Sequence, residues 1–289
     1  MLRVLLMLAA SGASPLSATS TDNAWMILQE AAADKSAENR AKAAHALGLL
    51  PKSKKAEEIV QKALLDGNTH VRVAAAKALG QIGTASARPK LRQALNDSEV
   101  EVVIAAANSL YLLKDPAAYE VYYALLTGER KSSGGLVHSE LQILKDRRSM
   151  EKLAFEIGIG FVPFGGMGYE AWKTITKDDT SAVRAAAAER LARDPDLKSR
   201  RALVDACSDN KWEVRLAAVD AIAERGDPAL IDPLTPLLED GNGSVRYDAA
   251  AAILRLKARH LTRRSRKRVR GVTAPAASRS RLAPSPAQR

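Results

Sequence analysis

A repeat with a period of 31 residues constrains the fold of this chain more than any other feature. The segments VRVAAAKALG at 71–80, VRAAAAERLA at 183–192 and VRLAAVDAIA at 214–223 show it most clearly. The chain contains seven such units, of which the first precedes the second by 32 residues and the fourth is a weaker copy. Their common segment begins at Asn39, Val71, Val102, Ser133, Val183, Val214 and Val245. Repeats of this kind are typical of stacked helical or strand units, each of which buries its apolar face only against its neighbours.

Within each unit the pattern predicts a pair of α-helices. In the second unit AEEIVQKALLD would form the first helix, and the second helix would begin near Val71. Apolar residues follow at Ala74, Ala75, Ala78 and Leu79, which is the spacing of one helix face. Abundant alanine and an aromatic content of only 4% also favour helices. We therefore expect an all-α fold, a superhelical α-solenoid of about seven hairpins with one insertion.

An aspartate and an arginine repeat in the same register. The aspartate stands five residues before the start position in six units, and the arginine follows it by six residues in five of them. The aspartate can accept hydrogen bonds from free N–H groups at the start of the second helix, and the arginine can bridge to an aspartate of its own or an adjacent unit. This signature consists of Asp34, Arg40, Asp66, Arg72, Asp97, Asp178, Arg184, Asp209, Arg215, Asp240 and Arg246.

This spacing, together with the segment VRVAAAKALGQIG at 71–83, resembles the HEAT-repeat family and especially its short repeats named for phycobilisome lyases. The resemblance covers about residues 24–256, and the period of 31 is shorter than the usual HEAT length. It implies a binding scaffold for other proteins. The subgroup implies an alternative, a chaperone or lyase for a chromophore-bearing subunit.

Units four and five are separated by about nineteen extra residues, which we place at 146–167 as a helix, SMEKLAFEI, and the loop GIGFVPFGGM. In one interpretation Phe155, Phe161 and Phe164 fill a seam between two blocks of repeats. In the other they form an exposed dock for a partner, next to Trp172 on the first helix of unit five. The loop lacks the third glycine or the lysine that nucleotide-binding loops require.

In a solenoid of this family, the second helices are expected to line the concave face. Six residues after each start position stand His45, Lys77, Asn108, Ser139, Glu189, Asp220 and Ala251. The charge of this row changes from basic or neutral to acidic along the chain, which suits a groove for an extended protein segment. The candidate partner-binding residues are therefore Lys77, Asn108, Glu189 and Asp220, and an ordinary solvated face is the alternative.

The net charge of +11 resides entirely in the C-terminal region. Eleven Lys and Arg and no acidic residue follow from Lys257 onward, so the 33 basic and 33 acidic residues of 1–256 cancel. We expect 257–289 to be a basic, largely disordered tail whose first part can extend the last helix. It could contact nucleic acid or another anionic surface, or act only as a solubilising tail.

The N-terminal segment MLRVLLMLAASGASPLSATS resembles a secretory signal peptide over residues 1–20. Cleavage is expected near Ala13, Ala18 or Ser20, which would make the protein periplasmic or secreted. Without this signal the protein would be cytoplasmic.

No residue is predicted to act in catalysis, to bind a cofactor or to bind a metal. The single cysteine, Cys207, stands where three other units have Leu64, Leu95 and Leu238, so it is expected to be a small buried residue. The chain has no His-Glu dipeptide of the kind that ligates iron in HEAT proteins that resemble deoxyhypusine hydroxylase.

These observations predict a noncatalytic scaffold for protein–protein binding, with an unidentified protein partner. The expected segments are the signal peptide 1–20, repeats one to four at 24–145, the insertion at 146–167, repeats five to seven at 168–256 and the tail 257–289. The first alternative is a nucleic-acid-binding HEAT protein that uses the basic tail. The second alternative is the lyase or chaperone implied by the phycobilisome subgroup.

Overall fold

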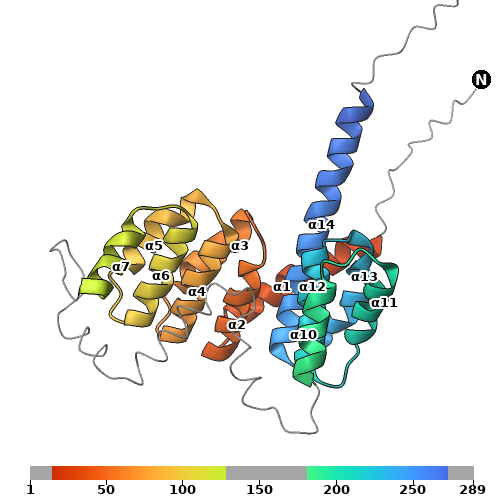
Figure 1. The fold of residues 1–289 in the computed structure, drawn as a ribbon, viewed down its shortest axis with the longest axis horizontal. Coiled ribbons are helices and arrows are strands. Elements are labelled where there is room, and N and C mark those ends of the chain that lie inside the picture. The colour runs from red at the N-terminus through yellow and green to blue at the C-terminus, as the bar shows by residue number, and fades with distance from the viewer. Residues whose placement is uncertain (1–14, 128–180, 273–289) are drawn as a thin grey trace, which may run out of the picture.

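The computed structural model describes residues 15–127 and 181–272, and every regular element in these two segments is helical (Figure 1). Units one to three are the pairs α1/α2, α3/α4 and α5/α6, and α7 is the first helix of unit four. The helices of this block are α1 (Pro15–Ala32), α2 (Ala37–Gly48), α3 (Lys54–Ala63), α4 (Thr69–Ile82), η1 (Ala85–Ala87), α5 (Arg88–Ala94), α6 (Val100–Leu112) and α7 (Ala117–Thr127).

The second block begins with α10, the second helix of unit five, and continues with units six and seven. Its helices are α10 (Ser181–Leu191), α11 (Leu197–Ala206), α12 (Trp212–Arg225), η3 (Pro228–Leu230), α13 (Ile231–Leu234), η4 (Thr235–Glu239) and α14 (Gly243–Val272). The all-α solenoid of helical hairpins that the repeat predicted is therefore confirmed.

The hairpin of unit two shows why the repeated residues form it. The Ser53 and Asn68 side chains cap α3 and α4 by accepting hydrogen bonds from backbone N–H groups of the first turn. The second helix ends at Gly83, whose φ of 75° lies in the left-handed region that favours glycine. Val71 and Leu79 are fully buried, as the period of the apolar residues predicted.

The stack of units does not follow the order of the chain. The second helices pack against one another in the order α10, α12, α14, α2, α4, α6, so that unit seven is followed in space by unit one (Figure 1). Helix α14 packs against both α1 and α2, as each second helix packs against the next unit elsewhere in the stack. In this order α6 and α10 stand at the two ends of the row of second helices.

Several predicted features lie outside the described residues. These are most of the signal segment, the second helix of unit four, the insertion 146–167, and the residues Phe155, Phe161, Phe164, Trp172 and Asp178. Helix α14 continues to Val272 and projects beyond the body, so the first part of the segment 257–289 is helical (Figure 1). In the parts of the chain that the structure describes, no helix is both long and apolar enough to cross a membrane.

Candidate functional site: a polar pocket where unit seven meets unit one

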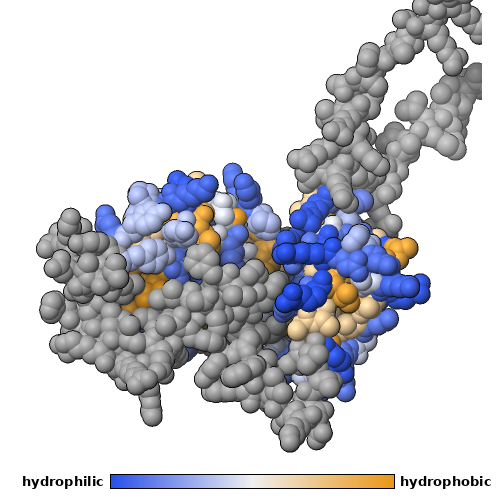
Figure 2. All heavy atoms as spheres, viewed as in Figure 1, coloured by the Kyte–Doolittle hydropathy of each residue, from blue (hydrophilic) through white to orange (hydrophobic). Residues whose placement is uncertain are grey.

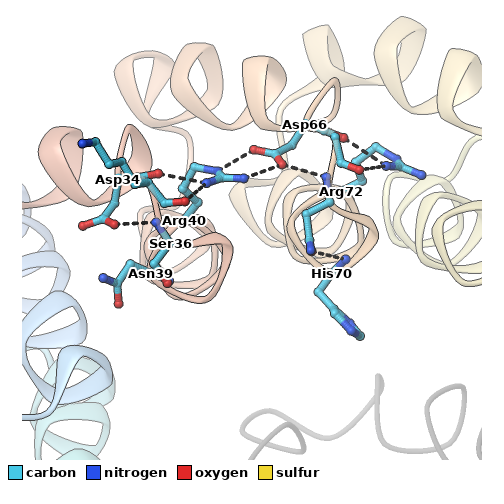
Figure 3. A network of polar contacts seen from close by, with 10 residues as sticks. Asp34, Ser36, Asn39, Arg40, Asp66, His70 and Arg72 are labelled. Carbon is cyan, nitrogen blue, oxygen red and sulfur yellow. Dashed lines mark hydrogen bonds and ion pairs between the residues drawn. The ribbon is translucent and has the colours of Figure 1, made fainter.

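The aspartates and arginines of the signature form a ladder along one edge of the stack (Figure 3). Arg40 donates from Nε to Asp66 Oδ2 at 2.7 Å and from Nη2 to Asp66 Oδ1 at 2.8 Å. The same two bonds join Arg72 to Asp97, at 2.8 and 2.9 Å. Each arginine thus binds the carboxylate of the next unit in the bidentate geometry that suits a guanidinium.

The arginines of the three bidentate rungs, Arg40, Arg72 and Arg215, also fix the turns of their own units. Arg40 Nη1 donates to the Asp34 carbonyl oxygen at 2.9 Å. The carboxylate of Asp66 accepts from the backbone N–H of Asn68 at 2.9 Å, and the bonds from Arg40 hold the pKa of Asp66 below its usual range. Asn68 is the capping residue of α4, so the aspartate orders the residue before the helix rather than the first helical turn. All these groups are satisfied within the fold, so the ladder is structural.

The ladder is interrupted where unit seven meets unit one. Arg215 forms the regular rung to Asp240, at 2.6 and 2.8 Å. Arg246 donates to the Asp240 carbonyl oxygen and lies over the Tyr247 ring, but among the described residues it has no carboxylate partner. This junction therefore differs from the regular contacts within each block.

The predicted row on the second helices is brought together in the order of the stack, not of the chain. Glu189 on α10 and Asp220 on α12 precede α14, and His45 on α2 and Lys77 on α4 follow it. The acidic end of the row therefore adjoins its basic end at the junction. Asn108 on α6 lies further along, where its Oδ1 accepts a hydrogen bond from the Tyr122 hydroxyl at 2.7 Å.

The same junction holds a pocket of about 710 Å³ on the face formed by the second helices. Its walls come from α10, α12, α14, α2 and α4, so residues near both ends of the described chain meet in it. The charged and ionisable side chains in the lining are His45, Glu189, Arg190, Arg193, Asp220, Glu224 and Arg255. In Figure 2 the visible face around α10 and α12 carries both hydrophilic and hydrophobic residues. The pocket is suited to a polar or charged group.

Two buried carboxyl groups distinguish this pocket. Asp220 in its wall is 5% exposed, and Asp248 on α14 is 2% exposed. Burial, with repulsion from Asp248 and Glu189, raises the pKa of Asp220 well above its usual range. Burial raises the pKa of Asp248 to about 6, although His45 Nε2 lies 3.9 Å from its Oδ2 and favours the ionised form. Both groups are therefore destabilised in their charged form.

The positive side of the pocket is also incompletely paired. Burial, with repulsion from Arg259, lowers the pKa of Arg255, whose Nε is buried without a hydrogen-bond acceptor among the described residues. Arg193 forms a 2.8 Å ion pair with Glu224 at the exposed rim. The lining thus combines negative groups, positive groups and a free donor, which is the composition of a binding site for a polar ligand.

The described residues offer neither a reactive cysteine nor a cluster of metal ligands. Cys207 is buried, as expected, and burial raises the pKa of its thiol to about 12, which makes it a poor nucleophile. Across residues 15–127 and 181–272, no group of three or more His, Cys, Asp and Glu side chains is arranged to hold a metal ion.

Sequence reasoning found His45, Glu189 and Asp220 but missed Asp248 and Arg255. A signal for Asp248 was present, because it occupies the position where four other units have alanine: Ala74, Ala105, Ala186 and Ala217. A carboxyl group at a position that alanine fills elsewhere is unusual in a buried helix contact. Arg255 carried no comparable signal.

The fold and its inter-unit ladder define an α-solenoid of short helical hairpins. The profile of the HEAT-repeat family matches residues 26–128 and 169–254, and the chain belongs to this family. The described helices α2 to α7 and α10 to α13 fall within the matched ranges, as does the first part of α14.

Three solved structures show limited similarity to this chain. The complex of CpcE and CpcF of phycocyanin lyase from Nostoc sp. PCC7120 matches with 21% identity over 87% of this chain and 99% of that chain, at a TM-score of 0.31. Human deoxyhypusine hydroxylase matches with 18% identity over 85% and 92%, at 0.31, and an engineered protein with 17% identity over 82% and 97%, at 0.27. A comparison with curated proteins found no match. Identities and TM-scores this low carry no information on activity.

Proposed function

We propose that this protein is a noncatalytic scaffold that binds an extended segment of another protein along the face formed by its second helices. The observation that carries the proposal is the pocket at the junction of units seven and one, which is open to that face and lined by residues of five helices, four of which contribute charged or ionisable side chains. HEAT repeats typically bind proteins, and a stack of this kind offers one continuous surface to an elongated partner.

The charge along this face supports a partner with polarity. Glu189 and Asp220 lie on one side of the junction and Lys77 on the other, so a segment would meet opposite charges along its length. Such complementarity fixes the direction of a bound segment more than it adds to affinity.

Affinity capture from the native host tests this function. We would compare the full chain with a double variant, Lys77→Glu with Glu189→Lys, which reverses two charges on the second-helix face without touching the ladder. The matched control, Lys62→Glu with Glu120→Lys, makes the same changes on first helices. We expect the partner to be lost from the first variant and retained by the second. Equal capture by both variants would place the interaction elsewhere and contradict the proposal.

The long basic helix gives a second candidate function, binding of nucleic acid. Eight of the eleven basic residues after position 256 fall within 257–272, the part that the structure places in α14. A basic helix that projects from the body can follow a phosphate backbone, and its binding would weaken steeply with salt. Loss of salt-dependent binding to duplex DNA on removing residues 257–289 would support this candidate, and no binding by the full chain would exclude it.

We also propose export as the route of the mature protein. Helix α1 begins at Pro15, so cleavage near Ala13 would leave it whole, whereas cleavage near Ser20 would shorten it by about one and a half turns. N-terminal sequencing of the protein from its host distinguishes these ends, and an intact Met1 start would contradict export.

A further inference from the structure

The buried polar groups of this protein divide into two kinds. Six polar or charged side chains are buried in the described residues: Glu57, Asp115, Ser109, Ser199, Asp220 and Asp248. The first four have hydrogen-bond partners; Arg92 donates to Asp115, for example, and Ser109 donates to the Ala76 carbonyl oxygen at 2.8 Å. Asp220 makes no hydrogen bond or ion pair within the described residues, and the contact of Asp248 is limited to His45 at 3.9 Å.

An unpaired buried carboxylate is costly, so its place in the fold is informative. Asp220 lies in the wall of the pocket and is not enclosed in the core. In the ladder, by contrast, each partly buried carboxylate is paired directly with an arginine. Asp220 is thus a carboxyl group in the pocket wall that lies near Arg255 but has no direct hydrogen bond or ion pair within the described residues.

We infer that the pocket receives the guanidinium or ammonium group of an arginine or lysine side chain from the bound segment, with the Asp220 carboxylate as its acceptor. This inference rests on the proposed function, because it identifies the chemistry that a partner segment must present. Asp248 adds negative potential behind Asp220 and does not line the pocket.

The size and the remaining groups of the pocket agree with this occupant. A volume of about 710 Å³ lies in the usual range for ligand pockets and admits a long side chain together with its neighbouring backbone. The partly exposed Arg255 side chain also lines the pocket, and its guanidinium can donate to a backbone carbonyl of the segment. A bound anion would be repelled by the Asp220 carboxylate, to which Asp248 adds negative potential.

Binding should depend on pH because the carboxyl groups must ionise to accept a cation. The groups that face Asp220 are Glu189 and Arg190 on α10, Glu224 on α12, Asp248 and Arg255 on α14, and His45 on α2. Asp248 titrates near pH 6 and Asp220 has a raised pKa, so a bound cation displaces protons from this site. Affinity is therefore expected to rise between pH 5 and pH 8.

The experiment uses the full chain and a displayed library of linear twelve-residue peptides. Selected peptides are resynthesised in pairs, with arginine or with citrulline, which has nearly the same shape but no charge, and lysine is paired with norleucine. Binding is measured by fluorescence anisotropy for the native chain, for Asp220→Asn and for Asp205→Asn. Asp205 is an exposed aspartate on α11 of the same unit and does not line the pocket, so it is the matched control.

We expect citrulline in place of one arginine to weaken binding to the native chain at least tenfold. Asp220→Asn should weaken binding of the arginine peptide by the same factor, so that the arginine and citrulline peptides bind this variant with equal affinity. Asp205→Asn should bind like the native chain. The melting temperature of Asp220→Asn should equal or exceed the native value, because a buried unpaired charge is removed. This combination separates loss of a binding group from loss of folding.

Three outcomes would overturn the inference. Equal affinity for the arginine and citrulline peptides, or equal affinity of the native chain and Asp220→Asn for the arginine peptide, would refute the cation pocket. If the same peptides no longer bind the double variant Lys77→Glu with Glu189→Lys, the proposed function survives. Selected peptides that ignore both sets of substitutions, or a library that yields no binder, refute the proposed function and the inference together.

Discussion

Arg72 joins two repeat units through one side chain, and this makes it a sensitive test of the ladder. Its side chain is 13% exposed and that of Asp97 is 14% exposed, with two hydrogen bonds between them. Replacing Arg72 with alanine removes these charge-assisted bonds and leaves Asp97 without its cation. We expect Arg72→Ala to lower the free energy of unfolding by about 2 kcal/mol. Urea denaturation at neutral pH measures this change.

The control for this prediction is the weakest rung. Arg184 makes a single 3.3 Å bond to Asp209 and its side chain is 44% exposed. Solvent screens this pair, so Arg184→Ala should cost less than about 1 kcal/mol. Equal losses for Arg72→Ala and Arg184→Ala would show that burial and bidentate geometry do not set the strength of the ladder.

Asp248 gives the protein a pH-dependent stability of unusual sign. Its pKa is raised to about 6, above the value near 3.9 of an unfolded chain, so the native state binds more protons between these values. The stability from a neutral Asp248 is complete below pH 4 and is lost as the pH rises through 6. At pH 4 the free energy of unfolding of Asp248→Asn should therefore be similar to that of the native chain. At pH 7.5 the variant should be more stable than the native chain, by up to about 3 kcal/mol.

Urea denaturation of both proteins across this pH range checks the sign. Asp205→Asn serves as the control, since it makes the same substitution at an exposed residue outside the pocket. A native chain that gains stability on Asp248 ionisation, relative to Asp248→Asn, would show that a cation already pairs with this carboxylate.

At the residue scale, the ladder was predictable and the pocket only partly so. Aspartate and arginine recur at fixed spacing near the same turn of each unit. Stacking therefore brings each arginine close to the aspartate of an adjacent unit, so their pairing follows from the repeat. The pairing of His45 with Asp248 does not, because 203 positions separate them in the chain and the repeat relates neither to the other. Only the stacking of unit seven on unit one brings them together.

At the scale of helices, Gly80 permits the close approach of α4 and α6. A Cβ at this position would lie 2.9 Å from Ser109 Cα and 2.6 Å from Ser109 Oγ, and this hydroxyl already donates to the Ala76 carbonyl oxygen. Alanine favours a helix over glycine by about 1 kcal/mol, but the overpacking costs about 1–3 kcal/mol. We expect Gly80→Ala to be destabilising overall and to lower the melting temperature.

Gly67 is the matched control for this substitution. It lies between α3 and α4, its φ is not in the left-handed region, and an added Cβ would meet no atom within 4 Å. Gly67→Ala should change stability by no more than about 0.5 kcal/mol. If Gly80→Ala proves as neutral as Gly67→Ala, the two helices are not held at the contact distance that the structure shows.

The sequence predicted the helices of the regular units well and that of unit seven poorly. The apolar period places α4 and α12 correctly because alanine and leucine mark one face in each. The first helix of unit seven is instead divided into η3, α13 and η4. Pro233 and Pro236 explain the division, because each lacks the backbone N–H that a continuous α-helix needs.

At the scale of the whole molecule, the order of the units is the feature that sequence reasoning could not supply. The units share one pattern of Asp, Arg and alanine. By this pattern alone, the second helix of any unit could pack against the helices of any other unit. The pattern therefore specifies how units stack but not which unit follows which. The choice of unit one as the neighbour of unit seven depends on the particular surfaces of α14, α1 and α2.

This arrangement predicts that the two blocks remain together when the chain between them is cut. A protease site inserted within 128–180 would yield two fragments, one ending after α7 and one beginning before α10. Helix α14 packs against α1 and α2, and Leu28 on α1 and Leu256 on α14 are both fully buried. We expect the fragments to elute as one species in size-exclusion chromatography after cleavage, and to separate when Leu28→Asp places a charge in the contact.

Glu30→Ala provides the control, because Glu30 is an exposed residue on the same helix and should leave the cleaved fragments associated. The pocket gives a second readout, since Asp220 and His45 belong to different fragments and a complete pocket requires both. Cleaved Leu28→Asp protein should lose any ligand of the pocket, while cleaved native protein should keep it. Fragments of the native chain that separate without denaturant would contradict the order of units, because a stack in chain order has no contact between α14 and α1.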